Sequence, residues 1–148
     1  MNDCMTCYWV NEAWGHVDDS AVLVGVDEDG GYLYVGRAAH EGDLLPAKVA
    51  PTHQGAFVAY NGREHSKFHY ELLTVVNGSM DWQKASDGDI PARAFPVGWT
   101  KMGEDVYVGR VPHQGTVTPG KIVPSEGTCN ISFGGVELRF TEYEVLVL

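Results

Sequence analysis

The chain contains two copies of one unit, and this duplication constrains the fold more than any other feature of the sequence. Residues Tyr34–Arg37 (YVGR) recur as Tyr107–Arg110, an offset of 73 residues (107 minus 34). The same offset aligns residues 8–75 with residues 81–148 without a gap, and 20 of the 68 aligned pairs (75 minus 7) are identical. Self-similarity of this kind is typical of one structural unit used twice. We therefore expect residues 8–75 and 81–148 to form two lobes of one pseudo-symmetric body.

The identical pairs include aromatic, turn-forming and charged residues. Among them are Trp9/Trp82, Gly15/Gly88, Gly25/Gly98, His40/His113, Pro46/Pro119, Lys48/Lys121, Glu64/Glu137 and Tyr70-Glu71/Tyr143-Glu144. Positions that both copies keep indicate a shared scaffold or a shared site, whereas positions that differ indicate sites present in only one copy. Residues 1–7 precede the first copy, and we expect them to form a flexible tail.

Short apolar stretches rich in β-branched and aromatic residues alternate with turn signals along both copies. Such stretches occupy residues 21–26, 32–38, 48–50, 56–60, 68–76, 106–111, 130–133 and 143–148. Asp29-Gly30-Gly31 and Asn61-Gly62 are suited to the positive φ angles of tight hairpin turns. No window of helical length has apolar residues at the i, i+3, i+4, i+7 spacing. The sequence therefore predicts an all-β fold of antiparallel sheets.

Charge and composition restrict the possible partners. Twenty acidic and ten basic residues give a net charge of −10, which opposes binding to nucleic acid and to anionic lipid surfaces. No stretch approaches the roughly 18–20 apolar residues that a membrane span requires. The first residues lack the basic and apolar segments of a signal peptide. We therefore expect no membrane span, and a cytoplasmic or vesicle-associated location or secretion without a signal peptide.

The three cysteines do not predict a disulfide framework, because their number is odd. Cys4 and Cys7 form a C-x-x-C motif, which could be half of a zinc site or a redox pair, but the chain has no second pair. We expect both to lie in a reduced terminal tail. Cys129 replaces Ala56 of the first copy and is predicted to be a small core residue.

The residues with the clearest binding chemistry are Asp27 and Lys48, supported by Asp43. A carboxylate accepts hydrogen bonds from two neighbouring hydroxyl groups, and an ammonium donates to nearby oxygens. This combination suits the diol of a sugar. Asp27 comes before the first predicted hairpin and Lys48 follows the next loop, so the two could meet at one end of the lobe. The alternative is a turn-capping aspartate and an ordinary exposed lysine.

Several ordered motifs resemble those of the DM9 repeat family. The strings LYVGRA (Leu33–Ala38), HEGDLLPAK (His40–Lys48), NGREH (Asn61–His65) and YELL (Tyr70–Leu73) are similar to its LYVGRA, HEGDLLPGK, GKEH and YEVL signatures. This family includes mannose-binding lectins of bivalves and flatworms, and its repeats also occur beside natterin toxins. The resemblance extends from about residue 9 to residue 148.

This resemblance implies two antiparallel β-sheet lobes related by a pseudo-twofold axis, often in a homodimer, that bind mannose without calcium. Carried over to this chain, the sugar-binding residues are Asp27 and Lys48. The second copy keeps Lys121, but Thr100 and Thr116 replace Asp27 and Asp43. We therefore expect one good sugar site per chain and a weaker second site at Lys121.

Other charged and aromatic residues have competing interpretations. Arg37 and Glu64 recur in both copies and are predicted to form a structural ion pair with each other, or alternatively Glu64 lines the sugar site. Trp14 and Trp99 occur in one copy each, and either could be a core residue or offer an aromatic face to a sugar ring.

The sequence predicts neither a metal site nor a cofactor. Asp27–Gly30 resembles the start of an EF-hand loop, but Ala38 takes the place of the bidentate glutamate. His65 and His69 are four residues apart, and on a strand this spacing separates them by roughly 13 Å.

The sequence favours a protein that is not an enzyme. We find no nucleophile-elbow, P-loop or H-E-x-x-H motif. The leading hypothesis is a calcium-independent mannose-binding lectin, with innate immune recognition of microbes as one setting. The alternative is a protein-interaction or vesicle-associated scaffold without significant sugar binding.

Overall fold

The computed structural model describes residues 6–148 and confirms the predicted all-β fold. Within this range, the first repeat forms β1 (Thr6–Ala13), β2 (Leu23–Val26), β3 (Tyr32–His40), β4 (Asp43–Ala50), the 3₁₀ helix η1 (Pro51–His53), β5 (Gly55–Tyr60), β6 (Arg63–Lys67) and β7 (His69–Asn77). The second repeat forms β8 (Asp81–Ser86), β9 (Gly98–Trp99), β10 (Asp105–His113), β11 (Thr116–Val123), η2 (Pro124–Glu126), β12 (Thr128–Phe133), β13 (Val136–Phe140) and β14 (Glu142–Val147).

The first strand lies outside the stretches from which the sequence predicted strands. Thr6 and Cys7, assigned above to the tail, belong to β1, which pairs with β7. Residues 1–5 of the expected tail, including Cys4 of the C-x-x-C motif, lie outside the described residues.

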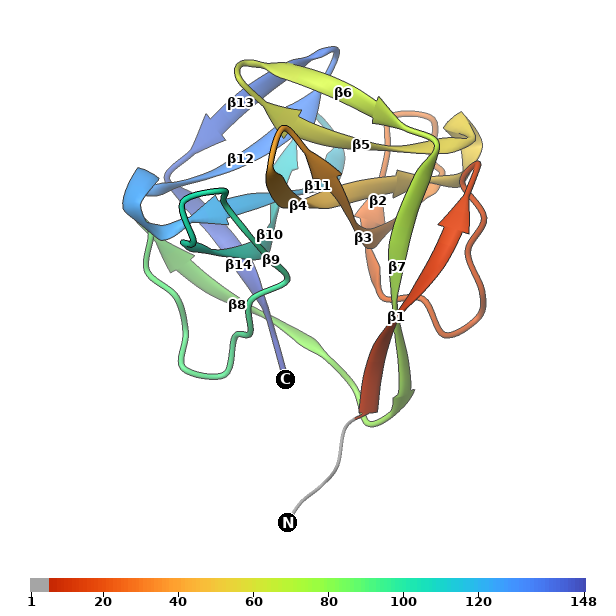
Figure 1. The fold of residues 1–148 in the computed structure, drawn as a ribbon, viewed down its shortest axis with the longest axis horizontal. Coiled ribbons are helices and arrows are strands. Elements are labelled where there is room, and N and C mark those ends of the chain that lie inside the picture. The colour runs from red at the N-terminus through yellow and green to blue at the C-terminus, as the bar shows by residue number, and fades with distance from the viewer. Residues whose placement is uncertain (1–5) are drawn as a thin grey trace.

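All strands belong to one hydrogen-bonded sheet whose order reveals a twofold relation between the repeats. The order is β1-β7-β3-β4-β5-β6-β13-β12-β11-β10-β14-β8. Outside this order, β2 pairs with β3, and β9 pairs with β10 and β4. The second half lists the counterparts of the first half in reverse order. In Figure 1 the two repeats accordingly lie side by side, with β6 and β13 together at the top.

The pseudo-twofold axis passes between β6 and β13. Arg63 pairs with Val136 across this junction, and these are equivalent positions of the two repeats (136 minus 63 is 73). The backbone N–H of Glu64 donates to Gly135 O, and the N–H of Glu137 donates to Gly62 O, each at 3.0 Å. The predicted lobes are thus joined by reciprocal backbone hydrogen bonds.

The repeats also interlock through short strands. β9 of the second repeat pairs with β4 of the first at Trp99 and Leu44. A methyl group at Gly98 would overlap the carbonyl oxygen of Leu44, and one at Gly25 would lie 2.5 Å from Val117 O. Because Gly25 and Gly98 are equivalent positions, the same close crossing occurs on both sides of the axis. Glycine is required there to let two backbones approach.

The hydrophobic core has one shared part and one part in each repeat. The shared cluster includes Val24, Leu33 and Leu73 from the first repeat and Val97 and Leu146 from the second. A second cluster forms around residues 38–72, and a third lies within residues 111–145. A shared core couples the stability of the two repeats.

Cys129 is a core residue, as the sequence predicted. It belongs to the cluster of the second repeat and is fully buried. Burial raises the pKa of its thiol, which keeps the thiol protonated and unreactive.

Each shared arginine joins its own repeat to the other. Arg37 Nε lies 2.8 Å from Glu71 Oε1, and Arg37 Nη1 donates to Val97 O at 3.1 Å. Its guanidinium lies over Trp9, 4.0 Å from the ring centroid. The predicted pair between Arg37 and Glu64 is therefore wrong, because Glu71 lies directly opposite Arg37 on the neighbouring strand β7.

The second arginine repeats this arrangement. Arg110 Nε lies 2.7 Å from Glu144 Oε1, and its Nη1 donates to Val24 O at 2.8 Å. Its guanidinium lies 4.6 Å from the centroid of the Trp82 ring. This reciprocal contact explains why both copies keep the tryptophan, the arginine and the glutamate.

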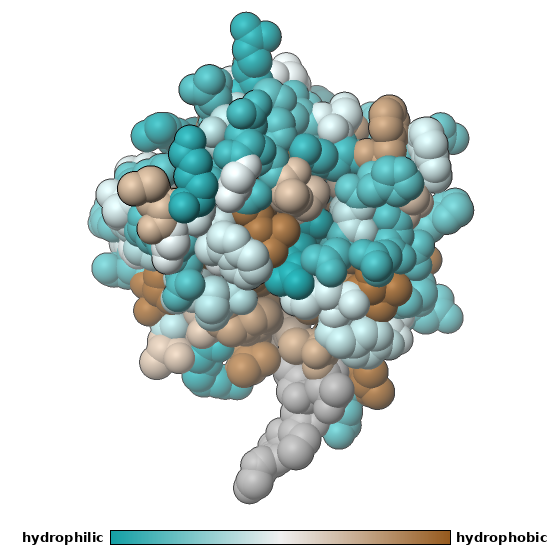
Figure 2. All heavy atoms as spheres, viewed as in Figure 1, coloured by the Kyte–Doolittle hydropathy of each residue, from teal (hydrophilic) through white to brown (hydrophobic). Residues whose placement is uncertain are grey.

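One face of the molecule is mainly polar (Figure 2). Figure 2 shows a face dominated by hydrophilic side chains, with apolar side chains in scattered groups. Among residues 6–148, no helix has the length and apolar character that a membrane crossing requires.

The crossing at Gly98 gives a direct test of the interlocked repeats. We expect Gly98→Ala to destabilise the protein by about 3 kcal/mol, because the new methyl group overlaps a carbonyl oxygen fixed in the sheet. Gly55→Ala is the matched control, since a methyl group there meets neighbours only at 3.6 Å and beyond. Urea denaturation measures both variants, and equal stability of the two would contradict the interlocked arrangement.

Candidate functional site

Asp27 and Lys48 line the same open pocket. The pocket has a volume of about 190 Å³. Its walls are formed by Asp27, Glu28, Lys48, His53, Phe57, Glu64, Phe133 and Gly134. The structure therefore brings together the two residues that the sequence singled out for sugar binding.

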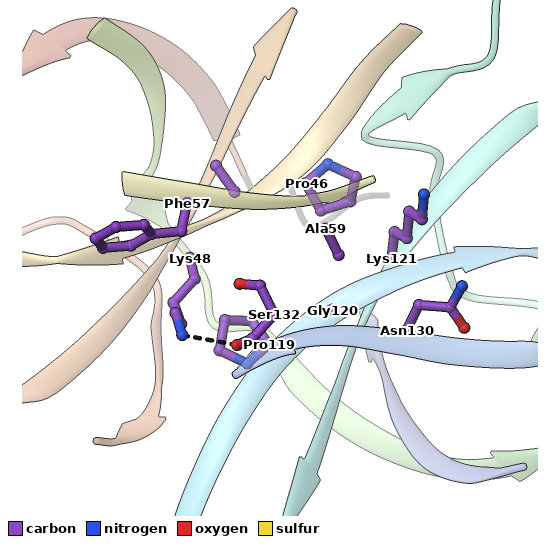
Figure 3. A pocket seen from close by; sticks show the side chains of 10 residues that line it. Pro46, Lys48, Phe57, Ala59, Pro119, Gly120, Lys121, Asn130 and Ser132 are labelled. Carbon is purple, nitrogen blue, oxygen red and sulfur yellow. Dashed lines mark hydrogen bonds between the residues drawn. The ribbon is translucent and has the colours of Figure 1, made fainter. Parts of the chain in front are cut away.

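Lys48 is held in place by its neighbours. Its Nζ lies 2.9 Å from Glu64 Oε2 and donates to the backbone oxygen of Ser132 at 2.7 Å, as Figure 3 shows for Ser132. The ammonium also lies 5.6 Å from the centroid of the Phe57 ring. An ammonium has three N–H donors. The two contacts use two of them, which leaves one donor for a ligand.

Asp27 forms another part of the pocket wall, and its carboxylate keeps hydrogen-bond acceptor positions for a ligand. It follows β2, and its backbone N–H donates to Gly31 O in the hairpin turn. Its Oδ1 accepts a hydrogen bond from the Glu28 N–H at 2.8 Å, and its Oδ2 lies 3.3 Å from His53 Nε2. A carboxylate has about four acceptor positions on its two oxygens. The carboxylate is therefore positioned by the turn and still able to accept hydrogen bonds from a ligand.

Asp29 lies at the rim of this site. Its Oδ2 accepts a hydrogen bond from the Thr52 hydroxyl at 2.6 Å, and its Oδ1 accepts one from the Gly31 N–H at 2.8 Å. The Thr52 hydroxyl and the Gly31 N–H both lower the pKa of Asp29. This carboxylate stays ionised near neutral pH and fastens the hairpin to η1.

Both repeats build the pocket. Glu64, on β6, accepts a hydrogen bond at Oε1 from the backbone N–H of Gly135 at 3.1 Å. Ser132, Phe133 and Gly134 come from the end of β12 and the turn after it. The sequence pointed to Glu64 only as one alternative for the pocket wall. The sequence did not indicate that the turn of the second repeat contributes to the pocket. An alignment of the two copies does not show which residues meet across the axis.

Asp43, the supporting residue proposed from the sequence, lies elsewhere. It begins β4 and pairs with His40 at the tip of the β3–β4 hairpin. Its Oδ1 accepts a hydrogen bond from the backbone N–H of Lys101 at 2.7 Å. Lys48 lies five positions further along the extended strand, which places the two residues roughly 17 Å apart along β4. Its contact with Lys101 makes it a link between the repeats.

The equivalent position in the second repeat keeps the cation and its carboxylate. Lys121 Nζ lies 3.4 Å from Glu137 Oε2. Glu137 Oε2 also accepts from Asn130 Nδ2 at 2.9 Å, and Oε1 accepts from the Gly62 N–H at 2.8 Å. Burial alone would raise the pKa of Glu137, but the Gly62 N–H, Lys121 and Asn130 together lower it. Three protein donors thus bind this carboxylate, one more than the two that bind Glu64.

The surroundings of Lys121 differ in chemistry from those of Lys48. Thr100 stands where the first repeat has Asp27, and its hydroxyl accepts a hydrogen bond from the Glu104 N–H at 3.2 Å. Glu126 stands in place of His53, and Asn130 in place of Phe57. Asn130 is occupied by Glu137 and by Thr128. The second position thus has no counterpart of the Asp27 carboxylate, and its Glu126 accepts a hydrogen bond from Asn130 Nδ2 at 3.4 Å.

A small cavity lies on the pseudo-twofold axis between the two lysines. Five equivalent pairs line it, namely Pro46/Pro119, Ala47/Gly120, Lys48/Lys121, Phe57/Asn130 and Ala59/Ser132. Its volume is only about 10 Å³, about the space of one water molecule. Figure 3 shows the lysine side chains extending on opposite sides of this region. The two positions are therefore separate.

Comparison with known families identifies the repeat. The model of the DM9 repeat matches residues 27–140, which are 114 of the 148 residues (140 minus 26). The chain belongs to the DM9 repeat family. No curated protein sequence matches it significantly.

A solved structure shares the fold of this DM9 protein. The crystal structure of the nematode sperm cell motility protein MFP2B is similar, with a TM-score of 0.67 at 12% sequence identity. The match covers 99% of this chain and 48% of that chain, so this chain spans about half the length of the MFP2B chain. At this identity the likeness establishes the fold alone.

The tryptophans unique to one copy lie outside the Asp27 pocket. Trp14 is exposed and stacks on Phe68 with 4.7 Å between ring centroids. Trp99 is exposed on β9. Neither contributes to the lining of the pocket.

The two histidines four residues apart are separated by the fold. His65 lies on β6, where its ring is 4.3 Å from the ring of His40, and His69 begins β7 and is exposed. The Nε2 atom of His40 is buried and has no hydrogen-bond partner among residues 6–148, and burial lowers the pKa of this histidine.

The three donors that bind Glu137 predict a pH-dependent contribution to stability. Its pKa lies below the ordinary value of 4.5, so its stabilising effect is present above pH 4.5 and is lost as the pH falls below it. We expect Glu137→Gln to destabilise the protein at pH 7 by about 2 kcal/mol, because Lys121 loses its buried partner. The variant should also lose less stability than the wild type between pH 5 and pH 3.

Urea denaturation at pH 7, 5 and 3 measures this contribution. Glu142→Gln is the matched control, since Glu142 is exposed on β14. A pH dependence of Glu137→Gln equal to that of the wild type would contradict the role assigned to Glu137.

Proposed function

We propose that this DM9 protein is a calcium-independent lectin that binds mannose at the Asp27 pocket and has no catalytic activity. The observation that carries the proposal is a carboxylate and an ammonium that face one open pocket and each retain hydrogen-bonding capacity. Asp27 accepts hydrogen bonds from two neighbouring sugar hydroxyls, and Lys48 donates to a sugar oxygen. Glu64 fixes the ammonium in position.

The size of the pocket favours a terminal monosaccharide. Its volume of about 190 Å³ is below the range of roughly 300–1,000 Å³ typical of pockets for drug-sized ligands. The Phe57 and Phe133 side chains add apolar surface beside the polar groups. Such a mixture suits a sugar ring, which has polar edges and apolar C–H faces.

The two repeats differ in their proposed sugar binding. Thr100 takes the position of Asp27 in the second repeat, and three protein donors already bind Glu137. The chain is therefore proposed to bind one mannose strongly. Agglutination of microbes, the setting implied by the lectin members of the family, would then require a homodimer to present two sites.

Substitutions in the pocket test the proposal. We expect Asp27→Asn and Lys48→Met each to weaken mannose binding by at least tenfold, since a charged hydrogen bond contributes about 1.5–3 kcal/mol. Lys121→Met is the matched control, because it removes an equivalent buried ion pair without altering the pocket. Isothermal titration with mannose measures each affinity, and circular dichroism checks the fold. Affinities of Asp27→Asn and Lys48→Met equal to that of Lys121→Met would reject the site.

The number of sites is a separate prediction. Titration of the wild-type protein should give one mannose per chain, because only the first repeat has an aspartate, Asp27, in the pocket of its lysine. Two sites of equal affinity would contradict this asymmetry. A glycan array without signal for any mannose-bearing glycan would favour the alternative function, a protein-interaction or vesicle-associated scaffold.

A further inference from the structure

Three metal-binding groups converge at the rim of the Asp27 pocket. His53 Nε2 lies 3.3 Å from Asp27 Oδ2 and 3.6 Å from Asp29 Oδ2. One ligand atom from each of the three residues lies within 4.8 Å of the other two. The hairpin between β2 and β3 supplies both carboxylates, and the end of η1 supplies the imidazole. The residue order suggests only a calcium loop at this hairpin, because it does not place His53 beside the two aspartates.

The two spacings between the His53 nitrogen and the carboxylates match the coordination shell of a small divalent ion. Zinc binds imidazole nitrogen and carboxylate oxygen at about 2.0–2.2 Å in a tetrahedron. Two ligand atoms of such a tetrahedron are about 3.4 Å apart, by geometry from that bond length. The two distances from His53 Nε2, 3.3 Å and 3.6 Å, are close to this value. An ion can therefore bind with small shifts of side chains that are already adjacent.

Neighbouring groups hold these side chains in place. Thr52 and Gly31 donate hydrogen bonds to the Asp29 carboxylate. The ring of His53 lies edge-on to Phe57, with 6.4 Å between centroids. Hydrogen bonds from outer groups to metal ligands orient the ligands and increase affinity. Lys48 does not compete for these carboxylates, because its ammonium is paired with Glu64.

The donor set selects among cations. Calcium prefers six to eight oxygen ligands, and magnesium an octahedron of oxygens and water, so an imidazole with two carboxylates favours neither. Imidazole and carboxylate together suit zinc and related first-row divalent ions. Three protein ligands leave a fourth position for water or another oxygen.

From this geometry we infer that Asp27, Asp29 and His53 bind one zinc-class divalent ion per chain. The second repeat has Thr100, Met102 and Glu126 at the equivalent positions, so the site exists only in the first repeat. Asp27 Oδ2 belongs to both the ion site and the wall of the sugar pocket. The ion therefore occupies one end of that pocket.

Titration with zinc chloride in the absence of sugar tests the inference. The full chain is used at pH 7.5 with Cys4→Ser and Cys7→Ser, which remove the C-x-x-C motif as a competing zinc ligand. We expect one ion per chain, and at least a tenfold loss of affinity in His53→Gln. His69→Gln is the matched control, because His69 is exposed at the start of β7 and is not one of the three converging metal-binding groups. Its zinc affinity should equal that of the parent.

Two results would overturn the inference. The first is no zinc binding at concentrations up to about 1 mM. A Kd of about 1 mM corresponds to a binding free energy of only about −4 kcal/mol. In that case His53 serves only as a hydrogen-bonding partner of the two carboxylates. The second is zinc binding that His53→Gln leaves unchanged. Because this titration contains no sugar, its failure leaves the lectin proposal intact, and loss of mannose binding leaves the zinc result intact.

Discussion

The structure depends on a reciprocal exchange of hydrogen-bonding groups between the two repeats. Arg37 donates to Val97 O, and the equivalent Arg110 donates to Val24 O. Glu64 accepts from the N–H of Gly135, and Glu137 accepts from the N–H of Gly62. Each repeat thus satisfies polar groups of the other, and a buried group left without a partner would cost about 1–3 kcal/mol. The duplication is therefore a requirement of the fold, since neither repeat completes its own contacts.

The candidate site arises where this symmetric scaffold carries unequal side chains. Lys48 with Glu64 and Lys121 with Glu137 form the same pair on both sides of the axis. In the first repeat the neighbouring turn adds Asp27, whose carboxylate keeps free acceptor positions. In the second repeat that position is Thr100, and Asn130 binds the glutamate directly. The shared ion pair serves the scaffold, and the surrounding turns determine which side has the chemistry to bind a ligand.

Much of the fold could be predicted from local patterns. Alternating apolar stretches with glycine-rich turns predict the strands, and the constant offset predicts the twofold relation. Asp27 and Lys48 could be paired because each lies beside a predicted turn and their chemistry is complementary. The burial of Cys129 followed from its apolar surroundings in the sequence.

Contacts between segments distant in the chain could not be predicted. The pairing of Arg37 with Glu71 depends on the register of β3 and β7, and that of Lys48 with Glu64 on the junction of β6 and β13. Asp43 lies near Lys48 in the sequence, yet an extended strand carries it away, towards Lys101. His53 escaped notice because a lone histidine in a turn gains meaning only from the two carboxylates beside it. These contacts depend on how distant segments of the chain are placed in the fold, which residue types alone do not determine.

A crystal structure of the chain with bound mannose would show directly whether the Asp27 pocket binds the sugar. We expect one sugar per chain, with its hydroxyls bonded to the Asp27 carboxylate and the Lys48 ammonium. The sugar should also contact the turn at Phe133 and Gly134, which the second repeat contributes. Mannose bound at Lys121 instead, or bound to the first repeat away from Asp27 and Lys48, would rule out the proposed site.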